Sequence, residues 1–136
     1  TVELARSSHP FSHVVGVEAR GFILGSAVAL HSACGFIPFR KIGKLPHTTI
    51  ARSYGLEYGD DTLQIHQDAC TAPSRILIVD DVLATGGTAC AAIRLIEKTG
   101  ASVNKLIFLL EIEALKGREN ILQQFPLMDV ESLKKI

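Results

Sequence analysis

The fold of this chain is decided by the stretch Arg75-Ile76-Leu77-Ile78-Val79-Asp80-Asp81-Val82-Leu83-Ala84-Thr85-Gly86-Gly87-Thr88-Ala89. Four consecutive apolar residues, 76–79, predict a strand that is buried on both faces, as in a parallel sheet. Two adjacent carboxylates, Asp80 and Asp81, follow where we expect this strand to end. A Thr-Gly-Gly-Thr turn comes next, and then apolar residues at the spacing of one helical face predict a helix that runs to about Gly100.

The turn at 84–88 has the composition of a phosphate-binding loop. Its two glycines let the backbone approach a ligand closely, and the first N–H groups of the following helix have no helical partner. A phosphate held there gains those donors and the positive end of the helix dipole. The residues that we expect to bind the phosphate are Ala84, Thr85, Gly86, Gly87 and Thr88.

The acidic pair in front of this turn suits a sugar. Asp80 and Asp81 do not favour a phosphate, but carboxylates are good acceptors for hydroxyl groups. Ribose 5-phosphate carries both a phosphate and neighbouring hydroxyls, so we expect the stretch to bind it. Without the strand and the acidic pair, the same turn would indicate only the capped start of a helix.

Composition and missing motifs narrow the class of protein. The chain has 136 residues, 47% of them hydrophobic, and a formal net charge of zero. This length suits one domain over 1–136, and the charge argues against a nucleic-acid or membrane partner. No apolar run approaches the roughly 20 residues that cross a bilayer. The glycine motifs of dinucleotide and NTPase sites are absent.

The Cys and His residues indicate neither a disulfide framework nor a metal site. Cys34, Cys70 and Cys90 form no C-x-x-C pair and lie in apolar or helical stretches. We therefore expect reduced structural thiols and a cytoplasmic protein. The five histidines share no metal-ligand spacing, so we predict no metal bound by protein side chains alone.

Strands and helices alternate along the rest of the chain. We expect strands at 14–17, 35–39, 48–54, 62–66, 103–112 and 127–130, and helices at 22–33 and 115–124. The segment 55–61 is too long for a tight hairpin. The alternation predicts an α/β domain with a mostly parallel sheet and an antiparallel excursion at 48–66. Ligands of such sheets bind beyond the carboxyl ends of the strands, where the turns 18–21 and 80–88 would both open.

Four segments of the chain, taken in order, resemble a known family. They are Val15-Gly16-Val17-Glu18-Ala19-Arg20-Gly21-Phe22, Arg40-Lys41-Ile42-Gly43-Lys44-Leu45-Pro46, Tyr54-Gly55-Leu56-Glu57-Tyr58-Gly59 and the stretch 75–89. The last resembles the phosphoribosyl pyrophosphate signature of the type I phosphoribosyltransferases, and the four together resemble adenine phosphoribosyltransferases. The similarity runs from about residue 14 to 115–118.

This resemblance implies a fold and a reaction. The fold would be the type I phosphoribosyltransferase fold, a mostly parallel sheet flanked by helices with an antiparallel flexible flap. The reaction would join adenine to phosphoribosyl pyrophosphate, giving AMP and pyrophosphate in purine salvage. Mg²⁺ would enter bound to the phosphoribosyl pyrophosphate, and the protein would be a homodimer.

The resemblance also implies roles for residues outside the signature. The turn 18–21 is similar to the family's pyrophosphate loop, with Arg20 beside the leaving group; an ordinary turn with Arg20 in a salt bridge is the alternative. Further cations for the pyrophosphate would come from Arg40, Lys41 and Lys44, one of them serving the neighbouring subunit.

A flap over the site is implied by the segment between Gly55 and Gly59. Glu57 would be the catalytic residue, handling a proton on the purine ring, and Tyr58 would bind the substrate. The flap would exclude water, which would otherwise hydrolyse the reacting sugar.

The front of the chain departs from the family. Thirteen residues precede Val14, and they do not resemble the hood segment that frames the adenine in the family. The chain also begins with Thr1, so we expect it to start within a longer sequence. Adenine specificity therefore rests on the resemblance alone.

Three other interpretations stay open. A non-catalytic nucleotide-binding regulator on the same fold would keep residues 80–88, which include the turn 84–88 (called the phosphate turn below), and could lose the acid of the flap. A transferase for hypoxanthine, guanine or xanthine would differ only in its base-binding wall. A phosphoacceptor domain would use Asp80 and Asp81 as a metal site, together with a further acid and a lysine that the sequence does not identify.

Overall fold

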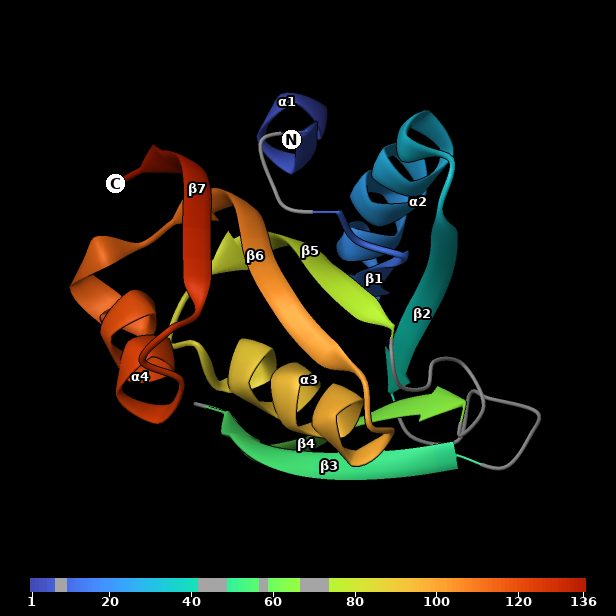
Figure 1. The fold of residues 1–136 in the computed structure, drawn as a ribbon. Helices are drawn as coiled ribbons and strands as arrows, with labels where there is room; N and C mark the ends of the chain where they lie inside the picture. The colour runs from blue at the N-terminus through green and yellow to red at the C-terminus, as the bar shows by residue number, and fades with distance from the viewer. Residues whose placement is uncertain (7–9, 42–48, 57–58, 67–73) are drawn as a thin grey trace.

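Helices and strands alternate along the described part of the chain. In the computed structural model this part is residues 1–136 without 7–9, 42–48, 57–58 and 67–73 (Figure 1). The elements are α1 (Val2–Arg6), β1 (His13–Val17), α2 (Arg20–Ser32), β2 (Gly35–Lys41), β3 (Thr49–Leu56), β4 (Gly59–His66), β5 (Arg75–Leu83), α3 (Gly87–Lys98), β6 (Ser102–Glu111), the 3-10 helix η1 (Glu113–Leu115), α4 (Gly117–Gln124) and β7 (Asp129–Lys135). None of the helices in this part is both long and apolar enough to span a membrane.

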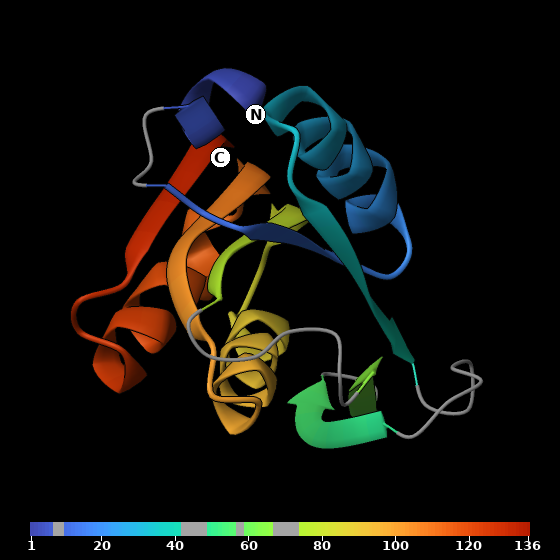
Figure 2. The same cartoon turned by 45° about the vertical axis from the view of Figure 1, so that its right-hand side comes forward.

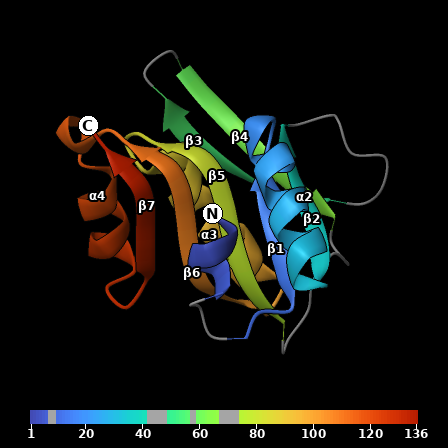
Figure 3. The same cartoon turned by 90° about the horizontal axis from the view of Figure 1, so that it is seen from above.

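The strands form one sheet with the order β3-β4-β2-β1-β5-β6-β7. From β2 to β7 all neighbours are parallel, whereas β4 pairs antiparallel with both β2 and β3. The predicted α/β fold with its antiparallel excursion is therefore confirmed. Seen from above, the β3–β4 hairpin lies at the end of the sheet where the parallel strands finish (Figure 3).

The core has two parts, one on each face of the sheet. Ile76 and Ile78 of β5 pack in the part that includes α3 and α4, and Leu77 and Val79 pack in the part that includes α1 and α2. Figures 1 and 2 show these helices on opposite faces. All four side chains are at most 1% exposed. The apolar run is thus buried on both faces, as its composition predicts.

Strand β5 is longer than the apolar run. It continues through the acidic pair and ends at Leu83. Its neighbour β6 supplies partners along that length, since Asp80 lies opposite Phe108 and Leu83 opposite Glu111. The prediction that the strand ends at the acidic pair is therefore wrong, and both carboxylates lie on the strand.

The β3–β4 hairpin also differs from the prediction. Its strands pair from Thr49 opposite His66 to Leu56 opposite Gly59, so two residues connect them. The prediction that 55–61 is too long for a tight hairpin is wrong. The backbone pairing of an antiparallel ladder continues over the polar residues 60–61, whose side-chain types alone indicate a loop.

Two elements at the ends of the chain were missed or shortened by the sequence analysis. Helix α1 was not predicted. In the structure its Ala5 is 1% exposed and belongs to the core. Strand β7 runs from Asp129 to Lys135, whereas the prediction stops at 130. After Val130 its residues are half-buried or exposed, so hydropathy does not mark them as a strand. These residues are part of the strand because their backbone pairs with β6.

Candidate active site

A pocket of about 100 Å³ opens where strand β5 gives way to helix α3. It is lined by the end of the strand, the turn, the start of the helix and one residue of β6. These residues are Asp80, Val82, Leu83, Ala84, Thr85, Gly86, Gly87, Thr88, Ala89 and Phe108. The pocket thus brings the whole turn 84–88 together with one of the carboxylates expected to bind a sugar.

The turn presents backbone donors to this pocket. The first hydrogen bond of α3 runs from the Cys90 N–H to the Gly86 carbonyl oxygen, at 3.0 Å. The N–H groups of Gly87, Thr88 and Ala89 come before that bond and have no partner within the helix. Gly86 has a φ of +84°, a conformation that favours glycine. The positive end of α3 therefore lies at the pocket, an arrangement that binds anions.

Asp80 is the titratable group in the lining of the pocket. Burial raises the pKa of its carboxyl to about 7, with a smaller contribution from the neighbouring charge of Asp81. Two contacts act in the opposite direction: the Asp81 N–H donates to Asp80 Oδ1 at 2.8 Å, and the charge of Arg20 lies nearby. A half-buried carboxyl of this kind gains from hydrogen bonds that a ligand's hydroxyl groups would donate.

The turn 18–21 packs directly on the end of β5. Arg20 Nε lies 2.5 Å from Asp81 Oδ2, and the Arg20 side chain is 78% exposed. A Cβ added at Gly21 would lie 3.0 Å from the Val79 carbonyl oxygen and 3.1 Å from Asp80 Oδ1. The two turns that we expected to open at one edge of the sheet are therefore adjacent. The salt bridge that was the alternative for Arg20 is present, with Asp81 as its partner.

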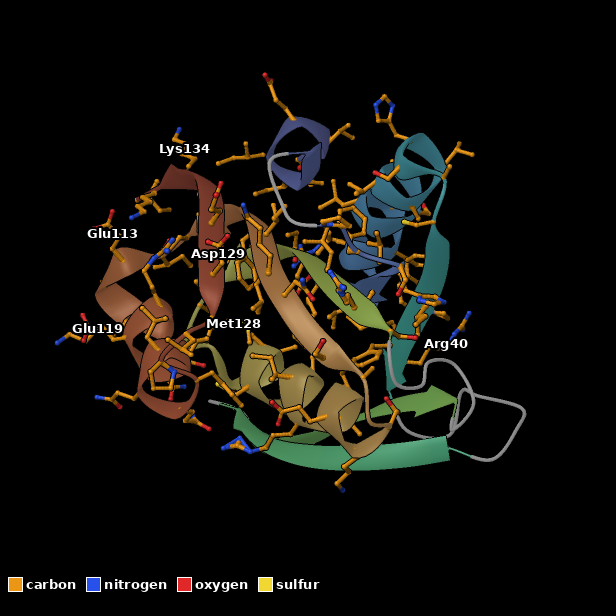
Figure 4. The ribbon with its side chains drawn as sticks, in the orientation of Figure 1. Arg40, Glu113, Glu119, Met128, Asp129 and Lys134 are labelled. Atoms are coloured by element: carbon orange, nitrogen blue, oxygen red, sulfur yellow. The ribbon has the colours of Figure 1, made fainter. Side chains whose placement is uncertain are left out.

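The end of strand β2 completes this edge. The Glu18 N–H donates to the Phe39 carbonyl oxygen at 2.9 Å, and the Glu18–Ala19 peptide bond is cis. Arg40 follows Phe39 near the end of β2 (Figure 4). Its guanidinium lies 5.4 Å from the centre of the Phe22 ring, at the start of α2. Arg40 thus lies beside the 18–21 turn, on the edge strand of the parallel part of the sheet.

The other predicted site residues are described in part or not at all. Lys41 is the last residue of β2 and lies opposite Leu63 of β4. Lys44, Glu57 and Tyr58 lie outside the described residues. Their roles stay predictions.

The pocket also contains residues that the sequence analysis did not select. Val82, Leu83 and Ala89 lie inside the quoted stretch, but their apolar side chains indicate only a core position. Phe108 belongs to β6 and reaches the pocket because it pairs with Asp80 across two parallel strands. No local signal in the sequence marks it.

Comparison with known proteins places the chain in a family. Residues 5–126 match the family model described as "Phosphoribosyl transferase domain". The adenine phosphoribosyltransferase of Brachyspira hyodysenteriae is 51% identical over 120 residues, covering 88% of this chain and 70% of the relative. That of Nocardioides sp. is 59% identical over 106 residues, covering 78% of this chain and 57% of the relative.

Solved structures of adenine phosphoribosyltransferases also resemble this chain in fold. The adenine phosphoribosyltransferase of Rhodothermus marinus has a TM-score of 0.91 and 44% identity, covering 99% of this chain and 75% of that one. The enzyme of Saccharomyces cerevisiae has a TM-score of 0.87 and 38% identity, covering 98% and 73%. The chain spans 57–71% of the length of the curated relatives named for this activity. It belongs to the phosphoribosyltransferase family, in the group formed by the adenine phosphoribosyltransferases.

Proposed function

We propose that this chain carries the active site of an adenine phosphoribosyltransferase, which joins adenine to phosphoribosyl pyrophosphate and releases AMP and pyrophosphate. The observation that carries the proposal is the pocket in which the 84–88 turn and Asp80 meet at the end of β5. The yeast neighbour is described in complex with adenine, and the Trypanosoma brucei neighbour with AMP, pyrophosphate and ribose-5-phosphate. Ligands of this chemistry fit the pocket's donors and acceptors.

In this proposal the 5-phosphate lies on the turn 84–88. The N–H groups at the start of α3 donate to its oxygens, and the helix dipole adds to the attraction. The ribose hydroxyls then donate to the carboxylates of Asp80 and Asp81. We assign the phosphate to the turn and the hydroxyl groups to the two carboxylates because a carboxylate repels a phosphate and accepts a hydrogen bond from a hydroxyl.

The leaving pyrophosphate would lie between the 18–21 turn and the end of β2. As adenine bonds to the anomeric carbon, the bond from that carbon to the pyrophosphate oxygen breaks. Positive charge then builds on the sugar and negative charge on the leaving group. Arg20 and Arg40 lie at this edge, and Lys41 and Lys44 follow in the chain. Such cations stabilise the departing charge.

Magnesium would accompany the substrate. Among the described residues, no group of three or more His, Cys, Asp or Glu side chains lies close enough to hold a metal ion. The two adjacent carboxylates at the site edge are hard oxygen donors, which fit Mg²⁺ when phosphate oxygens supply the other ligands. When bound, Mg²⁺ would neutralise charge on the pyrophosphate.

The two flap residues would have different roles, one in proton transfer on the base and one in keeping water out of the site. Glu57 would take or give the proton on the purine ring as the ring nitrogen attacks. Tyr58 would help to close the site against water. These roles rest on the resemblance of the segment 54–59 to the family.

A homodimer in the cytoplasm is part of the same proposal. On helix α2, Ile23 is 74% exposed and Leu30 is 85% exposed, and the smaller Ala27 between them is also exposed. These positions share one helical face, so they form an apolar stripe suited to a second copy. The cytoplasmic location rests on the cysteine pattern of the sequence, which predicts reduced thiols.

The test is pyrophosphate release from phosphoribosyl pyrophosphate with adenine, hypoxanthine and guanine in turn. We expect turnover with adenine, and we expect Glu57→Gln to lower kcat about 10²- to 10⁴-fold while AMP still binds. Glu97→Gln, an exposed change on α3, is the control. AMP binding without turnover for any base would instead support a regulator, and preference for another purine would change the assigned substrate.

A further inference from the structure

Three side chains form a hydrogen-bonded chain beside the phosphate turn. Arg94 of α3 donates to Oε1 of Gln124 at the end of α4. Gln124 Nε2 donates to Asn120 Oδ1 at 2.8 Å, and Asn120 Nδ2 donates to the Thr85 carbonyl oxygen at 2.9 Å. The chain of bonds thus leads from the middle of α3, through α4, back to the turn that precedes α3.

The direction of these bonds is set by Arg94. A guanidinium group only donates, so Gln124 must turn its carbonyl oxygen toward Arg94 and its NH₂ group toward Asn120. Asn120 must then accept with its own carbonyl oxygen, which leaves its NH₂ group for Thr85. The orientation of the Asn120 amide is therefore determined by a residue that it does not touch.

The bond to Thr85 orients one donor of the phosphate turn. In a trans peptide the C=O of one residue and the N–H of the next point in opposite directions. Holding the Thr85 carbonyl toward α4 therefore turns the Gly86 N–H away from α4. Both residues line the pocket.

Helix α4 also touches the turn through its backbone. A Cβ added at Gly86 would lie 2.7 Å from the Gly117 carbonyl oxygen, and one at Gly117 would collide with the Ala84 carbonyl oxygen. The backbone of Gly117, at the start of α4, therefore lies directly against the backbone of the phosphate turn. The Asn120 bond therefore acts on backbone that α4 already supports.

We propose that Asn120 is a positioning residue for the phosphate turn, with its amide oriented by Gln124 and Arg94. This inference rests on the proposed function, in which the turn binds the 5-phosphate. Asn120 acts through the Thr85–Gly86 peptide. Its loss should therefore weaken binding of ligands that carry the 5-phosphate and leave binding of the free base unchanged.

Gln124→Glu tests the inference at a distance from the turn. The new carboxylate still accepts from Arg94 but cannot donate to Asn120. The Asn120 amide then turns to donate to the carboxylate, which places its oxygen against the Thr85 carbonyl oxygen. The neighbouring Gln123→Glu makes the same change of charge at an exposed position of the same helix and is the matched control.

The measurements are AMP and ribose 5-phosphate affinity by calorimetry, and KM for each substrate. We expect Gln124→Glu to weaken both ligands about three- to tenfold and to raise KM for phosphoribosyl pyrophosphate by a similar factor. KM for adenine should stay within about twofold of that of Gln123→Glu. A purely structural role would lower the active fraction, and with it kcat, without this split between the two KM values. Asn120→Asp, which replaces the donor by an acceptor, should give the same pattern.

The outcomes separate the two proposals. If the unaltered chain binds neither AMP nor ribose 5-phosphate, the proposed function fails and this inference fails with it. If the unaltered chain binds them and both Gln124→Glu and Asn120→Asp bind as tightly as Gln123→Glu, the inference alone is overturned.

Discussion

At the scale of single residues, Asp80 lines the pocket and its burial has a cost for the stability of the fold. Its carboxyl lies on a central strand, beside Asp81, with a pKa raised by burial to about 7. An unfolded Asp has a pKa of about 4. Between these two pH values the folded chain keeps a proton that the unfolded chain releases, so the fold loses stability as pH rises from about 4 to 7.

Replacing this carboxyl by an amide should remove that dependence on pH. Asp80→Asn keeps an oxygen that can accept from the Asp81 N–H, and it carries no charge at any pH. The free energy of unfolding of the variant, relative to the unaltered chain, should therefore rise between pH 4 and pH 7.5, by at most about 4 kcal/mol. Urea unfolding at several pH values measures it.

The control for this change is Glu119→Gln, which removes one carboxylate from a side chain that is 67% exposed. If the two variants show the same dependence on pH, burial of Asp80 does not cause the effect. At the site, the same substitution of Asp80 should weaken AMP binding, because a charged acceptor for the ribose hydroxyls is lost.

At the scale of elements, helix α4 is held in place by a half-buried ion pair. Arg118 donates to both carboxylate oxygens of Glu111, at 3.0 and 2.6 Å, and also to the Val130 carbonyl oxygen and to Ser132. Glu111, at the end of β6, is 4% exposed. Its pKa is lowered, chiefly by the hydrogen bonds from Arg118. The end of β6, the start of α4 and strand β7 meet at this pair, and Arg118 directly follows Gly117, which lies against the phosphate turn.

Breaking this pair should destabilise the fold. Arg118→Met leaves the Glu111 carboxylate buried without its cation, and we expect a loss of about 3 kcal/mol in the free energy of unfolding. Lys116→Met breaks an exposed pair with Glu119, at 3.9 Å, on the same part of the chain, and should change stability by less than about 1 kcal/mol. Equal stability of the two variants in urea would show that the Glu111–Arg118 pair does not support α4.

At the scale of the whole molecule, the sheet is covered by helices on both faces, yet α2 keeps an apolar stripe on its outer side. Exposed apolar side chains at 23, 27 and 30 share that face. Light scattering at micromolar concentration should therefore give the mass of a dimer, and Leu30→Glu should shift it toward the monomer. Leu127→Glu, at a position that is 100% exposed before β7, is the control. A monomer for the unaltered chain would contradict the dimer, and a dimer for Leu30→Glu would contradict this interface.

The sequence by itself determined the central strand, the phosphate turn and helix α3. The reason is local: a run of four apolar residues, an acidic pair and a glycine turn each restrict the backbone through their own side chains. From the same local chemistry we predict which residues bind a phosphate and which bind a sugar. The family resemblance then supplied the reaction, because composition and spacing do not specify a base.

Only the tertiary structure decided what depends on contacts between distant segments. β5 continues through Asp80 because β6 supplies hydrogen-bond partners there, and Phe108 enters the pocket through the same pairing. The raised pKa of Asp80 follows from burial, which the sequence does not show. The bond from Asn120 to Thr85 spans 35 positions of the chain. Such contacts form where the packed sheet and helices bring distant backbone and side chains together, so no local sequence pattern predicts them.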